Sequence, residues 1–118
     1  MKVQKIYEKA MLILGKTEEG TSYPFMDRVP SLLNPDIATL NLFRTDDMKL
    51  PDVTKISDDI AVTQKEADGL AFCLAYIAAT EIADFPQARL ALLYKQRNQI
   101  MGSINTGMQE ITETIGIL

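Results

Sequence analysis

The sequence contains no histidine and a single cysteine, Cys73. A lone cysteine cannot form a disulfide within the chain, and without histidine it cannot build the usual zinc site or a cysteine-histidine nucleophile pair. The commonest general base of enzymes is also missing, as are the glycine-rich phosphate loop, the GxSxG elbow and the HExxH pair. We therefore expect a protein of the reducing cytoplasm that has no catalytic activity, no cofactor and no bound metal.

The chain also lacks a long apolar run. The longest, over residues 70–79, is far shorter than the roughly 20 residues that a membrane-spanning helix needs. Charged residues recur over residues 1–9, where a signal peptide needs an apolar stretch and a small-residue cleavage site. We expect neither a membrane span nor a secretion signal.

The composition that remains is that of an ordinary globular domain. The 118 residues are 47% hydrophobic and 24% charged, which argues against disorder, and a chain of this length buries a core without metal or disulfide. The net charge is −4; acids dominate residues 45–68, whereas Arg89, Lys95 and Arg97 are the only charges over residues 85–109. This asymmetry suits head-to-tail contact between subunits, although ordinary solvated faces are the simpler explanation.

Helical spacing is clearest in the first half of the chain. Apolar residues recur every three or four positions over residues 3–14, with charges opposite, which predicts an amphipathic helix ending near Gly15. After a polar loop the same period resumes over residues 25–43. Pro30 and Pro35 interrupt it, and an interior proline removes a helical hydrogen bond, so we expect one bent helix or two short ones.

The second half predicts a central helix. Residues 56–62 are the candidate for a short extended piece. Thr63 followed by Glu66 matches the capping box, in which each side chain binds the other residue's amide, so a helix should begin there. Over residues 70–79 no side of this helix is polar. A helix that is apolar all round must be buried, so we place it at the centre of the domain, either within the domain alone or at a subunit interface as well.

A short break over residues 84–87 should turn the chain into another helix. Pro86 suits the first turn of that helix because its missing amide costs nothing there, and the apolar face then continues to roughly Ile104. A break this short forces the two helices into an antiparallel hairpin. Glu81 would then lie level with Arg89, and we predict an exposed ion pair between them.

The C-terminal residues complete the predicted fold. Gly107 weakens the end of the last helix, and the β-branched residues that follow favour extended chain, so we expect residues 109–118 to form an extended, β-prone tail. The prediction is thus an all-α fold, a four- to five-helix antiparallel bundle over residues 1–108. Residues 109–118 are predicted to be a C-terminal assembly tail that pairs with a neighbouring protein; the alternative is that they fold back over the core of their own chain.

Two pairs of adjacent acids are the candidates for a metal site. Asp46 and Asp47 form one pair and Asp58 and Asp59 the other, and clustered oxygens suit hard cations. Neither fits the EF-hand spacing, and adjacent aspartates on an irregular segment are far more often turn and cap residues. An enzyme with carboxylates at Asp58, Asp59 and Glu66 is the weakest of the functions that we consider.

The apolar helix carries the remaining candidates. Cys73 lies inside the apolar run, where thiolate formation is disfavoured, so we assign it to the core. Phe72 and Tyr76 lie one turn apart and could line a ligand pocket, but a second packing layer or a subunit contact is the commoner reason for such a pair, and we favour the subunit contact. The other predicted subunit contacts lie in the tail: Ile111, Ile115, Ile117 and Leu118.

Several segments carry a family resemblance when they are taken in order. A short N-terminal helix is followed by Asp-Arg-Val-Pro-Ser-Leu-Leu-Asn (27–34) and Ile-Ser-Asp-Asp-Ile (56–60). The apolar helix of residues 70–84 comes next, then Ala-Arg-Leu-Ala-Leu-Leu-Tyr-Lys-Gln-Arg (88–97) and a tail ending Glu-Thr-Ile-Gly-Ile-Leu. The order and spacing resemble the head-tail connector (adaptor) proteins of tailed bacteriophages. The chain departs from that pattern at Ile115, where an aromatic residue is often found.

The resemblance implies a structural protein of the virion, encoded by a phage or prophage and assembled in the cytoplasm of the bacterial host. Such a subunit forms a homo-oligomeric ring beneath the portal, contacts portal and tail proteins, and lets DNA pass without reading its sequence. An acidic chain suits such a channel, since a basic lumen would hold DNA back. The alternative is a free-standing helical interaction or regulatory module that binds one partner through Phe72 and Tyr76.

Overall fold

The computed structural model describes the backbone of residues 1–15 and 26–117 and the side chains of residues 1–15 and 27–104. Within these residues the protein has helices and turns but no β-strand, which confirms the predicted all-α fold. The elements are α1 (Val3–Ile13), the 3-10 turn η1 (Met26–Arg28), α2 (Val29–Asn41), the 3-10 turn η2 (Asp46–Met48), α3 (Gln64–Thr80) and α4 (Gln87–Ile117).

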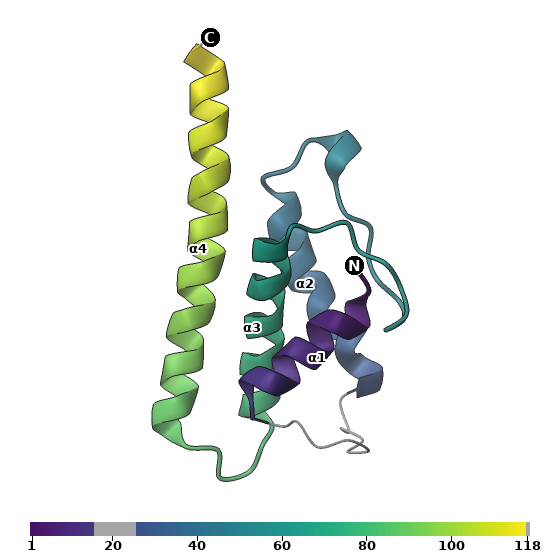
Figure 1. Ribbon diagram of the computed structural model, residues 1–118, viewed down its shortest axis with the longest axis vertical. Coiled ribbons are helices and arrows are strands. Elements are labelled where there is room, and N and C mark those ends of the chain that lie inside the picture. The colour runs from purple at the N-terminus through teal and green to yellow at the C-terminus, as the bar shows by residue number, and fades with distance from the viewer. Residues whose placement is uncertain (16–25, 118) are drawn as a thin grey trace.

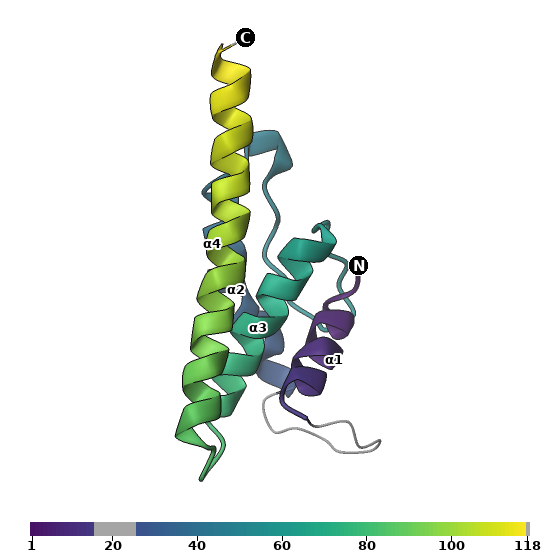
Figure 2. The ribbon, with the colours of Figure 1, turned by 60° about the vertical axis from the view of Figure 1, so that its left-hand side comes forward.

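Helix α3 is the central element of the bundle, as predicted. It lies between α4 on one side and α1 and α2 on the other, and α2, α3 and α4 follow one another in alternating directions (Figures 1 and 2). Its capping box is present: the Thr63 hydroxyl accepts from the amide of Glu66, and the Glu66 carboxylate accepts from the amide of Thr63 at 2.9 Å. These bonds fix the residue at which α3 begins.

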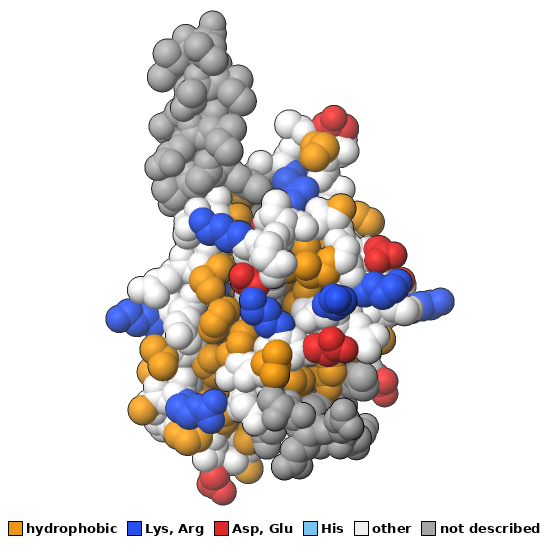
Figure 3. Space-filling view, in the orientation of Figure 1, with side chains coloured by type: hydrophobic (Ala, Val, Ile, Leu, Met, Phe, Trp, Pro, Cys, Tyr) orange, Lys and Arg blue, Asp and Glu red, His pale blue; other side chains and the backbone are white. Residues whose placement is uncertain are grey.

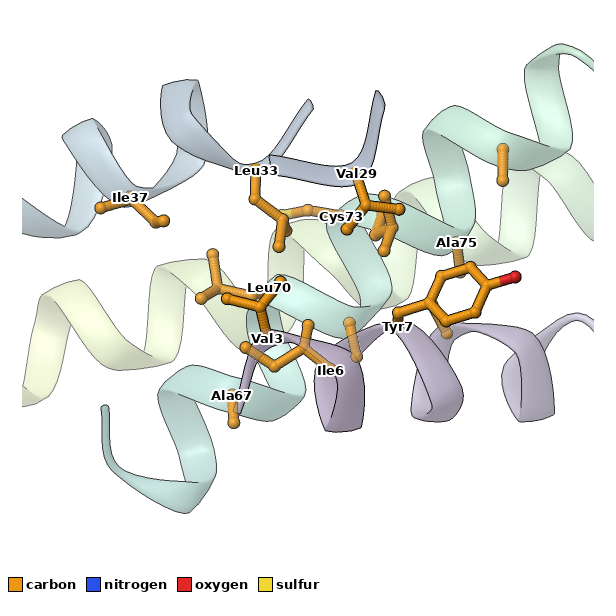
Figure 4. Close-up of a cluster of buried hydrophobic side chains, with 14 of the residues drawn as sticks. Val3, Ile6, Tyr7, Val29, Leu33, Ile37, Ala67, Leu70, Cys73 and Ala75 are labelled. Carbon is orange, nitrogen blue, oxygen red and sulfur yellow. The ribbon is translucent and has the colours of Figure 1, made fainter. Parts of the chain in front are cut away.

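The core forms where α1 and α2 meet α3. Val3, Ile6 and Tyr7 of α1 lie against the α3 helix, and Val29 and Leu33 of α2 cover Cys73 from the other side (Figure 4). Cys73 is fully buried, and burial raises the pKa of its thiol to about 12. The prediction that Cys73 is a core residue is confirmed.

The prolines of α2 are accommodated in a single helix. Pro30 lies in the first turn, where its missing amide costs no hydrogen bond, and η1 leads directly into that turn. Pro35 lies inside the helix on an exposed position. The Pro35 carbonyl accepts a hydrogen bond from the Thr39 hydroxyl at 3.2 Å. Of the two predicted forms, one helix is therefore observed.

The irregular segment after η2 is held in place by two asparagines of α2. Asn34 donates to the carbonyl of Val53 and accepts from its amide, at 3.0 and 2.9 Å. Asn41 forms the same pair of bonds with Leu50, at 2.8 and 2.7 Å. The two asparagines lie on one face of α2 two turns apart, so the extended chain runs along the helix. Both Leu50 and Val53 are thereby pressed into the core.

The predicted extended piece over residues 56–62 pairs with the N-terminus. Lys2 and Asp59 form an isolated antiparallel β-bridge. The amide of Val3 donates to the carbonyl of Asp58 at 2.9 Å, and the amide of Ile60 donates to the carbonyl of Met1 at 2.7 Å. The start of α1 is thus tied to the chain that enters α3.

The predicted hairpin of α3 and α4 is confirmed, but the predicted pair between Glu81 and Arg89 is wrong. Glu81 instead forms an ion pair with Arg28 of η1. The Arg89 guanidinium lies over the Phe85 ring, 5.0 Å from its centroid, and donates to the carbonyl of Leu14 at 3.4 Å. Glu81 and Arg89 lie level across the hairpin, but they do not pair. Arg28 reaches Glu81 from η1, and the Arg89 guanidinium lies over the Phe85 ring instead.

The expectation of an extended, β-prone C-terminal tail is also wrong. Helix α4 continues to Ile117, so residues 109–117 are helical. The β-branched residues of this stretch lose at most about 0.7 kcal/mol each relative to alanine in a helix, and Gly107 about 1 kcal/mol. Residues 105–117 contain no proline, and a helix that is already nucleated continues until such costs accumulate.

Candidate assembly surfaces

The contact between α3 and α4 sets the geometry of the exposed surfaces. A Cβ atom at Gly69 would lie 2.9 Å from the sulfur of Met101 and 3.1 Å from Cδ1 of Ile104. The backbone of α3 therefore approaches α4 closely here because Gly69 has no side chain. Farther along, the rings of Tyr76 and Tyr94 lie 5.3 Å apart between centroids, tilted by 51°.

The structure places Tyr76, one of the two predicted contact residues of α3, beside α4. Tyr76 is half-buried against Tyr94, and Phe72 is half-buried against the core. Tyr76 and Tyr94 therefore form a packing layer between α3 and α4, and one edge of this layer is open to solvent. Hydrophobic side chains gather along the line where the two helices meet (Figure 3). Tyr94 is 51% exposed, so the apolar surface extends onto α4; Leu92 is 53% exposed but, two positions away, lies on another side of the helix.

A second exposed apolar region lies after α2, at the end of the bundle where α3 begins (Figure 1). Leu42 is 78% exposed and Met48 of η2 is 58% exposed. Single exposed apolar residues are common on protein surfaces. The segment that contains η2 lies at the end of the molecule toward which α4 projects (Figure 1).

Helix α4 extends past the start of α3. Gly69 lies level with Met101 and Tyr76 with Tyr94, so the start of α3 at Gln64 lies level with about residue 106 in this antiparallel pair. Residues 107–117 therefore have no α3 residue beside them, and they span about 16 Å of helix. We call this stretch the α4 overhang (Figures 1 and 2).

Of the predicted tail contacts, Ile111, Ile115 and Ile117 lie on this overhang, and Leu118 lies outside the described residues. The side chains of Ile111, Ile115, Ile117 and Leu118 are outside the described residues. Their positions along the helix follow from the sequence: Met108, Ile111 and Ile115 are separated by three and four residues and so share one helical face. That face continues the spacing of Met101 and Ile104, which contact α3. The extended-tail interpretation missed this spacing, although the sequence contains it.

A buried polar cluster connects three helices below the overhang. Asp36 of α2 is 8% exposed and lies 3.5 Å from Nη2 of Arg97 on α4, and both interact with the Cys73 thiol. Burial raises the pKa of Asp36, and the opposing charge of Arg97 only partly offsets this effect. The ionised carboxylate is therefore stabilised less here than in water.

A buried ion pair closes the end of the bundle where α3 begins. Nη2 of Arg44 donates to both carboxylate oxygens of Glu66 at 2.7 Å, and Nη1 donates to the carbonyl of Met48 at 3.1 Å. Burial alone would raise the pKa of Glu66, but the bonds from Arg44 and Thr63 outweigh it, so the pKa is lowered. Arg44 thus ties η2 to α3, because it binds the Met48 carbonyl of η2 and the ionised Glu66 carboxylate of α3.

The acidic pairs form turn contacts and exposed ion pairs. The Asp58 carboxylate accepts from the amides of Thr54 and Lys55 at 2.8 and 3.0 Å, and these bonds lower its pKa. Asp46 pairs with Lys49 at 2.9 Å. Glu66, the third member of the carboxylate site considered from the sequence, is bound by Arg44.

Among the described residues, no group of three or more histidine, cysteine, aspartate or glutamate side chains is placed to hold a metal ion. In the same part of the chain, none of the helices has the length and apolarity that crossing a bilayer requires. Comparisons of the sequence and structure with protein-family models, curated proteins and solved structures give no match.

Proposed function

We propose that this chain is a structural subunit of a phage head-tail connector, which forms a homo-oligomeric ring beneath the portal and links head to tail. The α4 overhang is the observation that carries the proposal. A helix that leaves the bundle with a row of apolar residues at helical spacing is suited to pack into a groove of another protein. Because the overhang has no α3 beside it, that packing is available to a neighbouring subunit or to the portal.

Docking as a helix replaces the β-pairing expected from the sequence. Main-chain hydrogen bonds in α4 are already satisfied within the helix, so affinity must come from side chains such as Met108, Ile111 and Ile115. Two further apolar regions are available to a ring neighbour: the edge formed by Tyr76 and Tyr94, and the exposed Leu42 and Met48. The proposed role is assembly rather than catalysis, with portal and tail proteins as partners.

The proposed route for DNA is consistent with the charge of the chain. The net charge is −4, so a ring of many copies would be strongly acidic overall and would repel phosphates. Repulsion of this kind favours passage over retention, and we propose that DNA passes through without sequence recognition.

The portal protein of the same phage or prophage provides the test. Purified chain and portal are mixed and sedimented together, and the amount of chain that travels with the portal is measured. The proposal predicts co-sedimentation of full-length protein and its loss when residues 109–118 are deleted. Failure of correctly paired, folded proteins to associate would remove the connector proposal. A chain that instead binds a non-portal partner as a monomer would favour the regulatory module.

A further inference from the structure

Helix α4 is attached to the domain mainly through α3. Gly69 lies against Met101 and Ile104, and Tyr76 packs on Tyr94. Polar contacts with other elements are long: 3.5 Å from Arg97 to Asp36, and 3.4 Å from Arg89 to the carbonyl of Leu14. Figure 2 shows α4 standing beside α3, away from α1. Helix α4 is therefore a separate unit whose main packing partner is one face of α3.

The connection between α3 and α4 is short and strained. Asp84 has a φ of 60°, in the left-handed region that residues with a side chain disfavour, although aspartate enters it more readily than most. The amide of Phe85 donates to the carbonyl of Ile82 at 3.4 Å, a long bond. Before this stretch, Glu81 is anchored to Arg28. Residues 82–86 are thus the hinge of this connection. If the chain opened there, the strain at Asp84 would be relieved and few hydrogen bonds would be lost.

We infer that two copies of this chain exchange α4, so that the α4 helix of each copy packs against the α3 helix of the other. Opening residues 82–86 releases the left-handed conformation of Asp84, while every contact between α3 and α4 is made again across the two copies. Extended, these five residues span about 17 Å. Short strained hinges favour this kind of exchange. The inference concerns the chain alone and does not depend on the connector proposal.

The contact between Tyr76 and Tyr94 offers a direct test of this exchange. The full chain carrying Tyr76→Cys and Tyr94→Cys is unfolded in denaturant, refolded at low and high concentration, and separated by size. Monomer and dimer fractions are then treated with a short bis-maleimide. Cys73 can remain, because it is fully buried and its pKa is raised to about 12. Exchange predicts a covalent product of twice the chain mass from the dimer fraction and of single mass from the monomer fraction.

Two substitutions at the hinge test the same inference without touching the α3–α4 contact. Asp84→Gly removes the left-handed strain and should lower the dimer-to-monomer ratio about tenfold, whereas Asp84→Val increases the strain and should raise the ratio about tenfold. A dimer that yields only single-mass product would overturn the inference. So would refolding at high concentration that gives monomer alone, or hinge variants that leave the ratio unchanged.

Discussion

Gly69 of α3 lies so close to Met101 of α4 that a Cβ atom at position 69 would come within 2.9 Å of the methionine sulfur. The absence of a side chain at this one position sets the distance between the two longest helices. It also sets the register, which places the start of α3 near residue 106 and leaves the rest of α4 as an overhang. The candidate assembly surface is therefore a consequence of how α3 and α4 pack.

Enlarging position 69 should separate the two helices. Gly69→Leu places a branched side chain against Met101, Ile104 and Ile100, so we expect the free energy of unfolding to fall by about 1–3 kcal/mol. Gly102→Ala is the matched control, because nothing lies within 4 Å of its Cβ position, and it should add roughly 0.5–1 kcal/mol through helix propensity. Urea denaturation followed by circular dichroism measures both. A Gly69→Leu protein as stable as the parent would show that the helices are not in contact there.

The buried ion pair of Arg44 and Glu66 should contribute more to the free energy of unfolding than the exposed pair of Arg28 and Glu81. Arg44→Met leaves the Glu66 carboxylate buried without its partner, and we expect a loss of about 3 kcal/mol. Arg28→Met removes the partner of Glu81 at an exposed position and should cost less than about 1 kcal/mol. Thermal denaturation of the two variants side by side makes the comparison. Equal losses would mean that the burial of the Arg44–Glu66 pair has no energetic consequence.

Glu66 should also make the fold sensitive to acid. Its pKa is lowered in the folded protein because the bonds from Arg44 and Thr63 outweigh burial, so its stabilising contribution is present above its unfolded pKa. That contribution is lost as the pH falls through the folded pKa. We expect Glu66→Gln, which keeps an oxygen for the Thr63 amide, to have a lower Tm than the parent at pH 7 and a similar Tm near pH 2. A difference that is independent of pH would contradict this account.

Asp36 should have the opposite pH dependence. Burial raises its pKa, so the ionised form carries a penalty in the folded protein that disappears as the pH falls through the folded pKa. We expect Asp36→Asn to raise the Tm at neutral pH, with the gain shrinking toward pH 3. Melting curves across that range test the sign. A Tm lowered by the substitution at neutral pH would show that attraction to Arg97 outweighs the cost of burial.

The overhang should contribute little to the stability of the domain. Deleting residues 109–118 removes helix that has no α3 residue beside it, so the helical signal should fall while the Tm stays within a few degrees. A drop of many degrees would show that these residues pack on the domain itself.

Helical spacing and local motifs sufficed to predict most of the fold. The capping box at Thr63 and Glu66 fixed the start of α3, and its uniformly apolar surface indicated a central position. The short break at Pro86 predicted the hairpin. These features lie within a few residues of one another, so the sequence displays them directly.

Features that depend on contacts between distant segments could not be predicted in this way. Asn34 and Asn41 bind the backbone of an irregular stretch, and nothing in the spacing of apolar residues marks such bonds. Arg28 reaches Glu81 across the molecule, which displaced the predicted partner Arg89. The tail was assigned from the β preference of its residues, whereas continuity with an existing helix decided its form.

Electron microscopy of the cognate portal mixed with this protein tests the central claim most directly. The connector account predicts a closed ring of additional density beneath the portal when the full-length chain is present. It predicts bare portal with the chain that lacks residues 109–118, provided that this chain melts at the same temperature. Bare portal in the presence of folded full-length protein, or an intact ring with the truncated one, would contradict the account.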